Sequence, residues 1–307
     1  MTTPLDSNPL LCNIETGICE TPAQENNVQT IPVEKGSKPL KLLYFTDPIC
    51  SSCWGIEPQL RKLKLEYGHI LEVEYHMGGL LPDWSYNSGG ISKPSDVAHH
   101  WDEVSLHYDM PIDGDVWLED PLDSSYPPSI ALKAAQLQDN TKAVAMLRMM
   151  REMVFLKKKN ITKWEFIEQA GNLAGLELNK LQNDFNNTAK LSFQQDLDLA
   201  KSLSVRGFPT MFFNDALGNS ERVYGSKPYD VYQTAIKKLV PQVDRFAYAR
   251  DWQSLFGVYP TMTTREFAEL SEISKTYANV ILNDLLQQGL LSCYQCKNGD
   301  LWMLSGK

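Results

Sequence analysis

The feature that most constrains the fold is a pair of cysteines set between a buried strand and an amphipathic helix. Apolar residues dominate positions 40–45 and stop at Asp47-Pro48, a pattern typical of a strand buried on both faces. Cys50-Ser51-Ser52-Cys53 follows. Apolar residues then recur at helical spacing as far as Tyr67-Gly68, and positions 70–77 predict a second strand. The segment therefore predicts a βαβ unit with the cysteines at its first junction.

This junction suits a reactive thiol. Free backbone N–H groups and the positive end of the helix dipole stabilise a thiolate at a helix N-terminus. We therefore expect Cys50 to have a lowered pKa, to be the more exposed sulfur and to act as the nucleophile, while Cys53 is the buried resolving thiol. The alternatives are a zinc half-site or two inert thiols. The strand–helix setting favours a redox motif.

A second segment, Val205-Arg206-Gly207-Phe208-Pro209-Thr210, precedes a returning strand. A proline at this position is compatible with a cis peptide bond, which would expose the backbone of Phe208. Such an edge could pair with an extended substrate. The alternative is an ordinary trans proline on an edge strand.

The rest of the chain divides into regions of different composition. Residues 1–38 are rich in Asn, Thr, Pro and Glu and predict an irregular arm, interrupted by apolar spots at Leu10-Leu11-Cys12 and Ile18-Cys19. A helical block covers residues 95–204, with a single helix expected over 178–203. We expect an α/β domain from residues 39–94 and 205–240, the helical block as an insertion, and a separate module over 241–307.

The C-terminal module has the element order of a winged helix-turn-helix, with helices expected at 264–273 and 275–288 and a hairpin around Lys297-Asn298-Gly299-Asp300. From Val243 onward it holds six basic and seven acidic residues, within a chain of net charge −9. Affinity for nucleic acid depends on phosphate contacts that this module cannot supply. The sequence predicts a docking or structural role and no nucleic-acid partner.

Two further cysteine pairs lie near the two ends of the chain. Cys293 and Cys296 lie at the C-terminal hairpin, and Cys12 and Cys19 could complete a set of four thiolates, which fits tetrahedral zinc. A structural zinc is thus one hypothesis, beside a labile disulfide or unpaired buried thiols. No organic cofactor is expected.

The compartment affects how these cysteines are interpreted. The N-terminus has no basic and apolar leader pattern, and no stretch approaches 18 uninterrupted apolar residues. We expect a cytoplasmic protein that does not span a membrane. In a reducing compartment, close cysteine pairs are more often catalytic or metal-binding than structural.

The segments LLYFTDPICSSCW and RGFPTMFF, with a helical insertion between them, resemble the DsbA-like thioredoxin superfamily, nearest to its FrnE and 2-hydroxychromene-2-carboxylate isomerase branch. The resemblance implies a thioredoxin fold with an inserted helical domain, a nucleophilic Cys50, a resolving Cys53 and a cis-proline at Pro209. The isomerase relatives have serine at the position of Cys50, which argues against glutathione-dependent isomerisation here.

A closer resemblance covers nearly the whole chain. The stretches KPLKLLYFTDPICSSCWGIEPQLRKLKLEYG, GDVWLEDPL, IALKAAQLQ, KKKNIT and PYDVY are similar to the YjbH (SpxH) group of cytosolic DsbA-like proteins. Some of these are adaptors that deliver a transcription regulator to the ClpXP protease. The group has a His/Cys-rich N-terminal segment, and the corresponding segment here holds Cys12 and Cys19 but no histidine.

Two functions follow. The first is a thiol–disulfide oxidoreductase, an enzyme in which Cys50 attacks a protein or small disulfide substrate and Cys53 releases it. Phe208 and Trp54 are expected at the substrate site, where Trp54 also packs beside the cysteines. The alternative is a YjbH-like adaptor that binds a client regulator and presents it to ClpXP, with the same fold kept as a docking surface.

Overall fold

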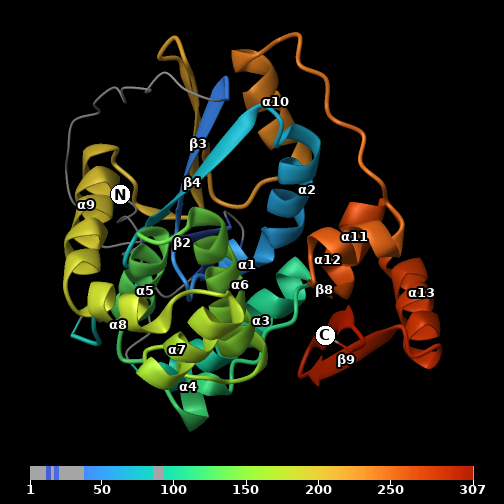
Figure 1. The fold of residues 1–307 in the computed structure, drawn as a ribbon, viewed down its shortest axis with the longest axis horizontal. Coiled ribbons are helices and arrows are strands. Elements are labelled where there is room, and N and C mark those ends of the chain that lie inside the picture. Colours follow the sequence, from blue (N-terminus) through green and yellow to red (C-terminus); the bar gives the residue numbers. More distant parts are fainter. Residues whose placement is uncertain (1–11, 15–16, 21–37, 86–92, 307) are drawn as a thin grey trace, which may run out of the picture.

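The computed structural model describes residues 12–14, 17–20, 38–85 and 93–306 (Figure 1). Its strands are β1 (Cys12–Asn13), β2 (Ile18–Glu20), β3 (Leu40–Thr46), β4 (Leu71–Met77), β5 (Gly207–Phe208), β6 (Thr210–Asp215), β7 (Ser220–Tyr224), β8 (Thr261–Thr263), β9 (Leu291–Cys296) and β10 (Gly299–Leu304). Its helices are α1 (Ser51–Gly55), α2 (Glu57–Tyr67), α3 (Pro94–Tyr108), α4 (Val116–Glu119), α5 (Tyr126–Gln136), α6 (Asn140–Leu156), α7 (Trp164–Leu173), α8 (Leu178–Asn186), α9 (Thr188–Ser202), α10 (Tyr229–Leu239), α11 (Trp252–Val258), α12 (Thr264–Ser271) and α13 (Lys275–Gln287).

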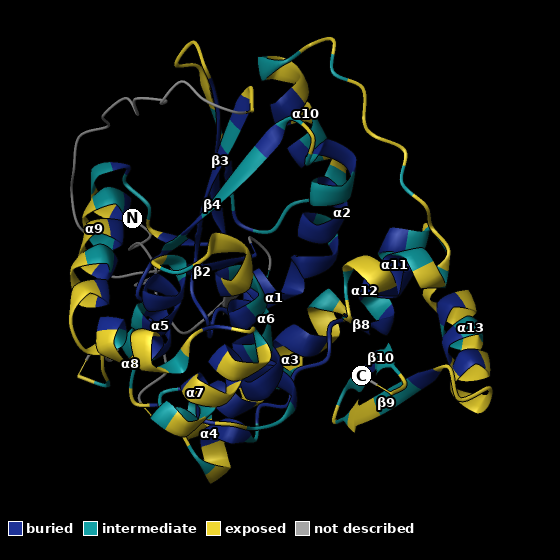
Figure 2. Ribbon diagram, in the orientation of Figure 1, coloured by how far each residue is buried: buried dark blue, intermediate teal, exposed yellow. Residues whose placement is uncertain are grey.

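A four-stranded sheet in the order β4-β3-β6-β7 forms the centre of the molecule. Strand β3 runs parallel to β4 and antiparallel to β6. Helices α2 and α10 lie to one side of this sheet and α9 to the other (Figure 1). Because both faces are covered, β3 and β6 are buried along almost their whole length (Figure 2), which explains the apolar sequence of β3.

The helical block between β4 and β5 contains α3 to α9 and packs its apolar faces into the same core as the sheet. The single helix expected over 178–203 was wrong, because α8 ends at Asn186 and α9 begins at Thr188. Asn187 separates them with non-helical backbone angles, φ −124° and ψ −93°. Its side-chain amide donates to the carbonyl of Asn183 (2.8 Å), a local bond that competes with continuation of the helix.

The C-terminal segment has its own small core. It combines α11, α12 and α13 with a three-stranded sheet in the order β8-β10-β9. Buried charges attach it to the rest of the molecule. The Glu266 carboxylate accepts from both terminal nitrogens of Arg148 (2.6 and 3.0 Å) and lies 3.2 Å from Nε of Arg61. Helices α2, α6 and α12 thus meet around one carboxylate.

The N-terminal arm differs from the irregular segment expected. Strands β1 and β2 pair with each other, and β2 pairs with β5 in a sheet of order β1-β2-β5. The apolar spot at Ile18-Cys19 lies in β2, where Ile18 and Cys19 are buried. Leu10 and Leu11 lie outside the described residues. Within the described part of the chain, no helix has the length and apolar character needed to cross a membrane.

Replacing the buried carboxylate should loosen the C-terminal segment. Glu266→Gln leaves the buried Arg61 and the partly buried Arg148 beside a neutral group, and we expect a loss of about 3 kcal/mol or more in the free energy of unfolding. Glu269→Gln, in the same helix but in partly exposed ion pairs, should cost less than about 1 kcal/mol. Urea unfolding of both variants measures this. Equal losses would contradict the role of Glu266.

Candidate functional site

Cys50 occupies the N-cap of α1. Its backbone is extended (φ −73°, ψ 106°) and its Sγ accepts a hydrogen bond from the backbone N–H of Cys53 at 3.1 Å. The turn that leads from β3 into this helix is fixed by Asp47, whose carboxylate accepts from the backbone N–H of Ile49 (3.0 Å) and of Leu80 (2.8 Å). The strand-to-helix junction predicted from the sequence is therefore present, with Cys50 at the helix N-terminus.

Both cysteines are fully buried, at 0% exposure each. The expectation that Cys50 is the more exposed sulfur was wrong, because β2 of the N-terminal arm covers it. Cys19 Sγ lies 3.5 Å from Cys50 Sγ. Cys50 and Cys53 are free thiols, whereas Cys19 is disulfide-bonded.

A buried arginine lies beneath the cysteine pair. Arg151 of α6 has 0% exposure and donates to Oγ1 of Thr46 (2.6 Å), to the carbonyl oxygen of Asp47 (3.3 Å) and to the carboxylate of Glu57 (2.5 Å). Its Nε has no hydrogen-bond partner among the described residues. The inserted helical block thus places a positive charge against the end of β3 and the start of α2.

The two thiols respond oppositely to this environment. Burial raises the pKa of Cys50, and its hydrogen bond with Cys53 adds to that rise. Burial also acts to raise the pKa of Cys53, but the hydrogen bond from Cys50 and the charge of Arg151 outweigh it and lower that pKa. The lowered pKa expected for Cys50 was therefore wrong for the closed site, since the covering strand removes the solvation that a thiolate there would need.

The Phe208–Pro209 peptide bond is cis, and Phe208 is fully buried. Its ring fills the space beside Gly78, where an added Cβ would lie 1.7 Å from Cζ of Phe208. The backbone edge at Phe208 pairs with Cys19, in antiparallel register, and Gly207 pairs with Glu20. The edge that the sequence offered to an extended substrate is occupied by the chain's own β2.

Trp54 does not face a substrate site in this structure. Its ring is fully buried, its Nε1 donates to the carbonyl oxygen of Pro111 (3.0 Å), and it stacks on Phe155 with ring centroids 5.5 Å apart. The guanidinium of Arg148 lies over the Trp54 ring, 4.5 Å from the ring centroid. Of the two roles expected for Trp54, the structure provides the packing role beside the cysteines.

The described residues do not form the four-thiolate zinc site. Cys19 is disulfide-bonded and lies at Cys50, so its sulfur is not a thiolate ligand here. Cys293 and Cys296 are on β9, and burial raises the pKa of their thiols to about 11 and about 12. Among the described residues, no three His, Cys, Asp or Glu side chains are grouped to hold a metal ion. The side chain of Cys12 lies outside the description.

Sequence reasoning missed the polar groups around the dithiol. Hydrogen bonds from Tyr44 and Thr46 help to lower the pKa of Cys53, and Tyr108 donates to Oγ of Ser52 at 3.1 Å. Arg151 lies in the methionine-rich helix α6. The usable signal was an arginine among the apolar residues of this helix, because an arginine buried there requires a nearby acceptor.

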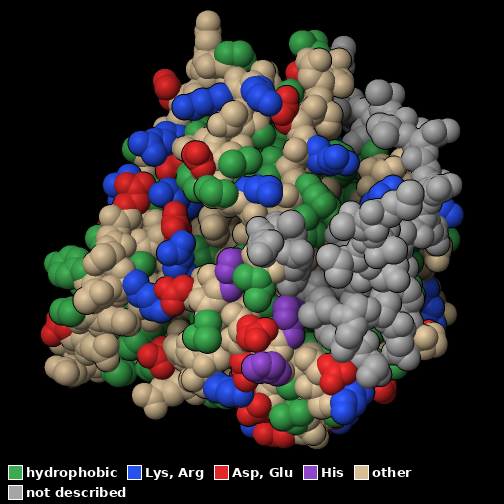
Figure 3. Space-filling model, turned by 180° about the vertical axis from the view of Figure 1, so that it is seen from behind, with side chains coloured by type: hydrophobic (Ala, Val, Ile, Leu, Met, Phe, Trp, Pro, Cys, Tyr) green, Lys and Arg blue, Asp and Glu red, His purple; other side chains and the backbone are tan. Residues whose placement is uncertain are grey.

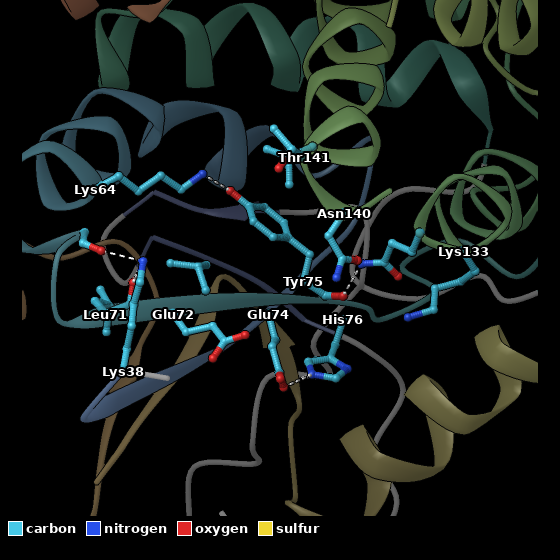
Figure 4. A pocket seen from close by; sticks show the side chains of 14 residues that line it. Lys38, Lys64, Leu71, Glu72, Glu74, Tyr75, His76, Lys133, Asn140 and Thr141 are labelled. Atoms are coloured by element: carbon cyan, nitrogen blue, oxygen red, sulfur yellow. Dashed lines mark hydrogen bonds and ion pairs between the residues drawn. The ribbon is translucent and has the colours of Figure 1, made fainter. Parts of the chain in front are cut away.

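A separate cavity of about 590 Å³ follows the outer edge of β4, between that strand and helices α5 and α6 (Figure 4). Its polar groups bind one another: Lys64 Nζ donates to the hydroxyl of Tyr75 (2.6 Å), Gln136 donates to the Tyr75 carbonyl (3.1 Å), and His76 faces Glu74 at 3.8 Å. No cysteine lines it. The cavity is therefore distinct from the dithiol site.

Comparisons with known proteins agree with this architecture. The thioredoxin family model matches residues 43–234. The ClpXP adapter protein SpxH of Halalkalibacterium halodurans is 32% identical over 301 residues, which cover 96% of this chain and 97% of that protein. SpxH of Shouchella clausii is 31% identical over 297 residues, 95% of each. The cytosolic disulfide reductase DsbM of Pseudomonas aeruginosa superposes with a TM-score of 0.54 at 21% identity, over 66% of this chain and 100% of that one.

The fold and the family match define a thioredoxin-like protein with an inserted helical block, as the sequence predicted. The likeness to the SpxH proteins extends over nearly the whole chain, including the segment beyond residue 234. The chain belongs to the SpxH family, which confirms the resemblance drawn from its sequence.

Removing the charge beneath the dithiol should make the thiols harder to ionise. Because the charge of Arg151 lowers the pKa of both cysteines, Arg151→Met should raise the first pKa of the dithiol and reduce the thiolate fraction at a given pH. Arg148→Met removes the same charge from the same helix, but Arg148 contacts Glu266, Glu152 and the Trp54 ring, so it should shift this pKa much less. Ultraviolet titration of the thiolate compares them. Equal shifts would contradict the assignment.

Asp47 should give the folded protein a distinct pH dependence. Its carboxyl is fully buried, and burial raises its pKa from 3.8 to about 6. The folded state therefore holds this proton more tightly than the unfolded chain, so the free energy of unfolding should fall as the pH rises from about 4 to 6. Asp47→Asn cannot ionise and should lack that component. Urea unfolding across this range tests it, and a parent-minus-variant difference that does not change with pH would refute it.

Proposed function

We propose that this protein is an adaptor that binds a client transcription regulator and presents it to a ClpXP-type protease. The observation that carries the proposal is the similarity to SpxH adapter proteins over 95–96% of the chain, well beyond the region shared with disulfide reductases. The proposal makes the thioredoxin-like region and the C-terminal segment parts of one docking platform in the cytoplasm.

The state of the dithiol supports this choice. A constitutive oxidoreductase needs a solvent-accessible nucleophile and an open backbone edge beside it. Here Cys50 is fully buried and the Phe208 edge is paired with β2. Mixed surface charge also favours a protein partner: on the face in Figure 3, acidic and basic side chains alternate, without a broad basic patch over its described part.

For the C-terminal segment we propose a winged-helix-like module that docks protein rather than nucleic acid. Helix α13 exposes apolar side chains at Tyr277 (57%) and Val280 (60%), and the segment as a whole is not basic. Exposed apolar side chains are used in protein contacts, whereas phosphate binding requires clustered positive charge.

A second candidate function, thiol–disulfide exchange, is favoured by one specific observation. Cys50 and Cys53 are free thiols at a helix N-terminus, close to a cis Phe208–Pro209 bond. In this function Cys50 is the nucleophile, Cys53 the resolving thiol and Pro209 the residue that sets the substrate-pairing edge. A protein or small disulfide would be the substrate once β2 has left that edge.

A reconstituted degradation assay separates the two functions. The assay contains ClpXP, this protein and the transcription regulator that the YjbH (SpxH) group delivers. We expect the regulator to be degraded about tenfold faster or more with this protein present, because tethering raises its local concentration at the protease. The Cys50→Ser/Cys53→Ser double variant should retain the acceleration, since docking needs no thiol.

Insulin reduction is the matching enzymatic assay, with Cys50→Ser as control. An adaptor whose Cys50 is covered by β2 should reduce little insulin. The parent protein and the Cys50→Ser variant should then reduce insulin at the same rate. Absence of any acceleration of client degradation by the parent protein would refute the adaptor proposal. Loss of acceleration in the double variant, together with insulin reduction by the parent alone, would favour the oxidoreductase.

A further inference from the structure

A second cavity, of about 490 Å³, adjoins the cavity of about 590 Å³ along β4. Four residues line both cavities: Lys64 of α2, Tyr75 of β4, and Thr141 and Val144 of α6. Beyond this shared end, the second cavity is enclosed by α2, α6 and the C-terminal segment, which contributes residues 258–261 and Met303. Parts of the chain that lie far apart in sequence therefore form its walls.

The second cavity is lined mostly by apolar side chains, and we call it the apolar cavity. Helix α6 contributes Val144, Met149 and Met153, and the C-terminal segment contributes Val258 and Met303. Its volume lies within the range of small-molecule sites, roughly 300–1,000 Å³. Covering such a lining with an apolar molecule removes apolar surface from water on both partners, which is favourable. The apolar cavity therefore suits the hydrocarbon part of a ligand.

The end shared by the two cavities is polar and positively charged. Lys64 Nζ donates to the hydroxyl of Tyr75 at 2.6 Å (Figure 4), and among the described residues no carboxylate pairs with Lys64. Tyr75 is 5% exposed, and no described residue accepts its hydroxyl proton. Burial acts to lower the pKa of Lys64, but Tyr75 and Tyr259 outweigh it and raise that pKa. An ammonium beside a hydroxyl that can still donate is suited to an anionic oxygen.

The other cations that line the apolar cavity are engaged elsewhere. Arg61 and Arg148 both pair with the buried Glu266, at 3.2 and 2.6 Å. Nζ of Lys157 lies over the ring of Tyr294, 5.6 Å from its centroid. The charge offered to a ligand at the shared end is therefore a single ammonium. It matches a carboxylate better than a phosphate group, which carries roughly two negative charges at neutral pH.

We propose that the two adjoining cavities form a binding site for a fatty acid. Its carboxylate binds at Lys64 and Tyr75, and its alkyl chain fills the apolar cavity. The site is separate from the Cys50–Cys53 pair, and the inference does not depend on the adaptor function. Because the ligand contacts α2, α6 and the C-terminal segment together, its binding stabilises the arrangement in which they are packed.

Isothermal titration calorimetry of the full-length protein with decanoate tests the proposal. One molecule should bind per chain. Decanol has the same alkyl chain without the charge and should bind about tenfold more weakly or worse. Butyrate has the carboxylate but buries little apolar surface, so it should give no measurable binding. Absence of decanoate binding, or binding of several molecules per chain without one saturable site, would overturn the proposal.

Two variants locate the head and the tail of the ligand. Lys64→Met should weaken decanoate binding about tenfold or more and leave decanol binding unchanged, because only the acid is charged. Lys142→Met makes the same change at an exposed lysine of α6 that lines neither cavity, and it should bind decanoate like the parent. Ala145→Trp places a large ring in the apolar cavity and should abolish binding of both molecules.

Equal affinity of the parent and Lys64→Met for decanoate would overturn the proposal. Loss of binding in Lys157→Met alone would also overturn it, because the carboxylate would then lie elsewhere. If Lys64→Met or Ala145→Trp lacks the parent's thermal transition, Thr141→Glu decides. Thr141 is exposed at the shared end, in the first turn of α6, where an acidic residue is compatible with the helix. Its carboxylate should repel decanoate but not decanol, and unchanged decanoate binding would contradict the site.

Discussion

The structure depends on a single buried charge. Arg151 reaches from the inserted helical block to the end of β3 and to α2, and all of its partners are buried or nearly so. Removal from water of an isolated guanidinium is too costly to be tolerated, so Thr46, Asp47 and Glu57 must surround it. The same contacts bring α6 against the strand–helix junction. The orientation of the insertion and the electrostatics of the dithiol therefore share one cause.

A second constraint is the backbone edge of the short strand β5, which pairs with β2. A short strand such as β5 presents unpaired backbone groups beside the cysteines, and such an edge pairs with any extended segment that reaches it. In this chain the segment is β2, held by the conformation of Gly17 and by burial of Ile18. Pairing satisfies the edge, excludes water from Cys50 and places Cys19 against it. The closed site is therefore a consequence of an arm that is long enough to return to this edge.

Sequence reasoning succeeded where local pattern and chemistry agree. The apolar β3, the cysteines at a helix start and the glycine-ended α2 form one local unit, and each signal lies within a few residues of the others. It failed where long-range contacts decide. Nothing in residues 1–38 indicates that Cys19 reaches Phe208, about 190 residues away in the chain. Likewise the zinc hypothesis joined Cys12 and Cys19 to Cys293 by ligand type alone, without knowledge of where the arm lies.

Burial of Cys50 also explains how arm position and reactivity are coupled. At the N-cap of α1 the sulfur receives the Cys53 N–H and the positive end of the helix, and Arg151 lies near, all of which favour a thiolate. Desolvation under β2 outweighs them and keeps the proton on Cys50. Strand β2 contributes to that burial, because Cys19 Sγ lies 3.5 Å from Cys50 Sγ. The position of the arm therefore bears on both the access to Cys50 and the burial that raises its pKa.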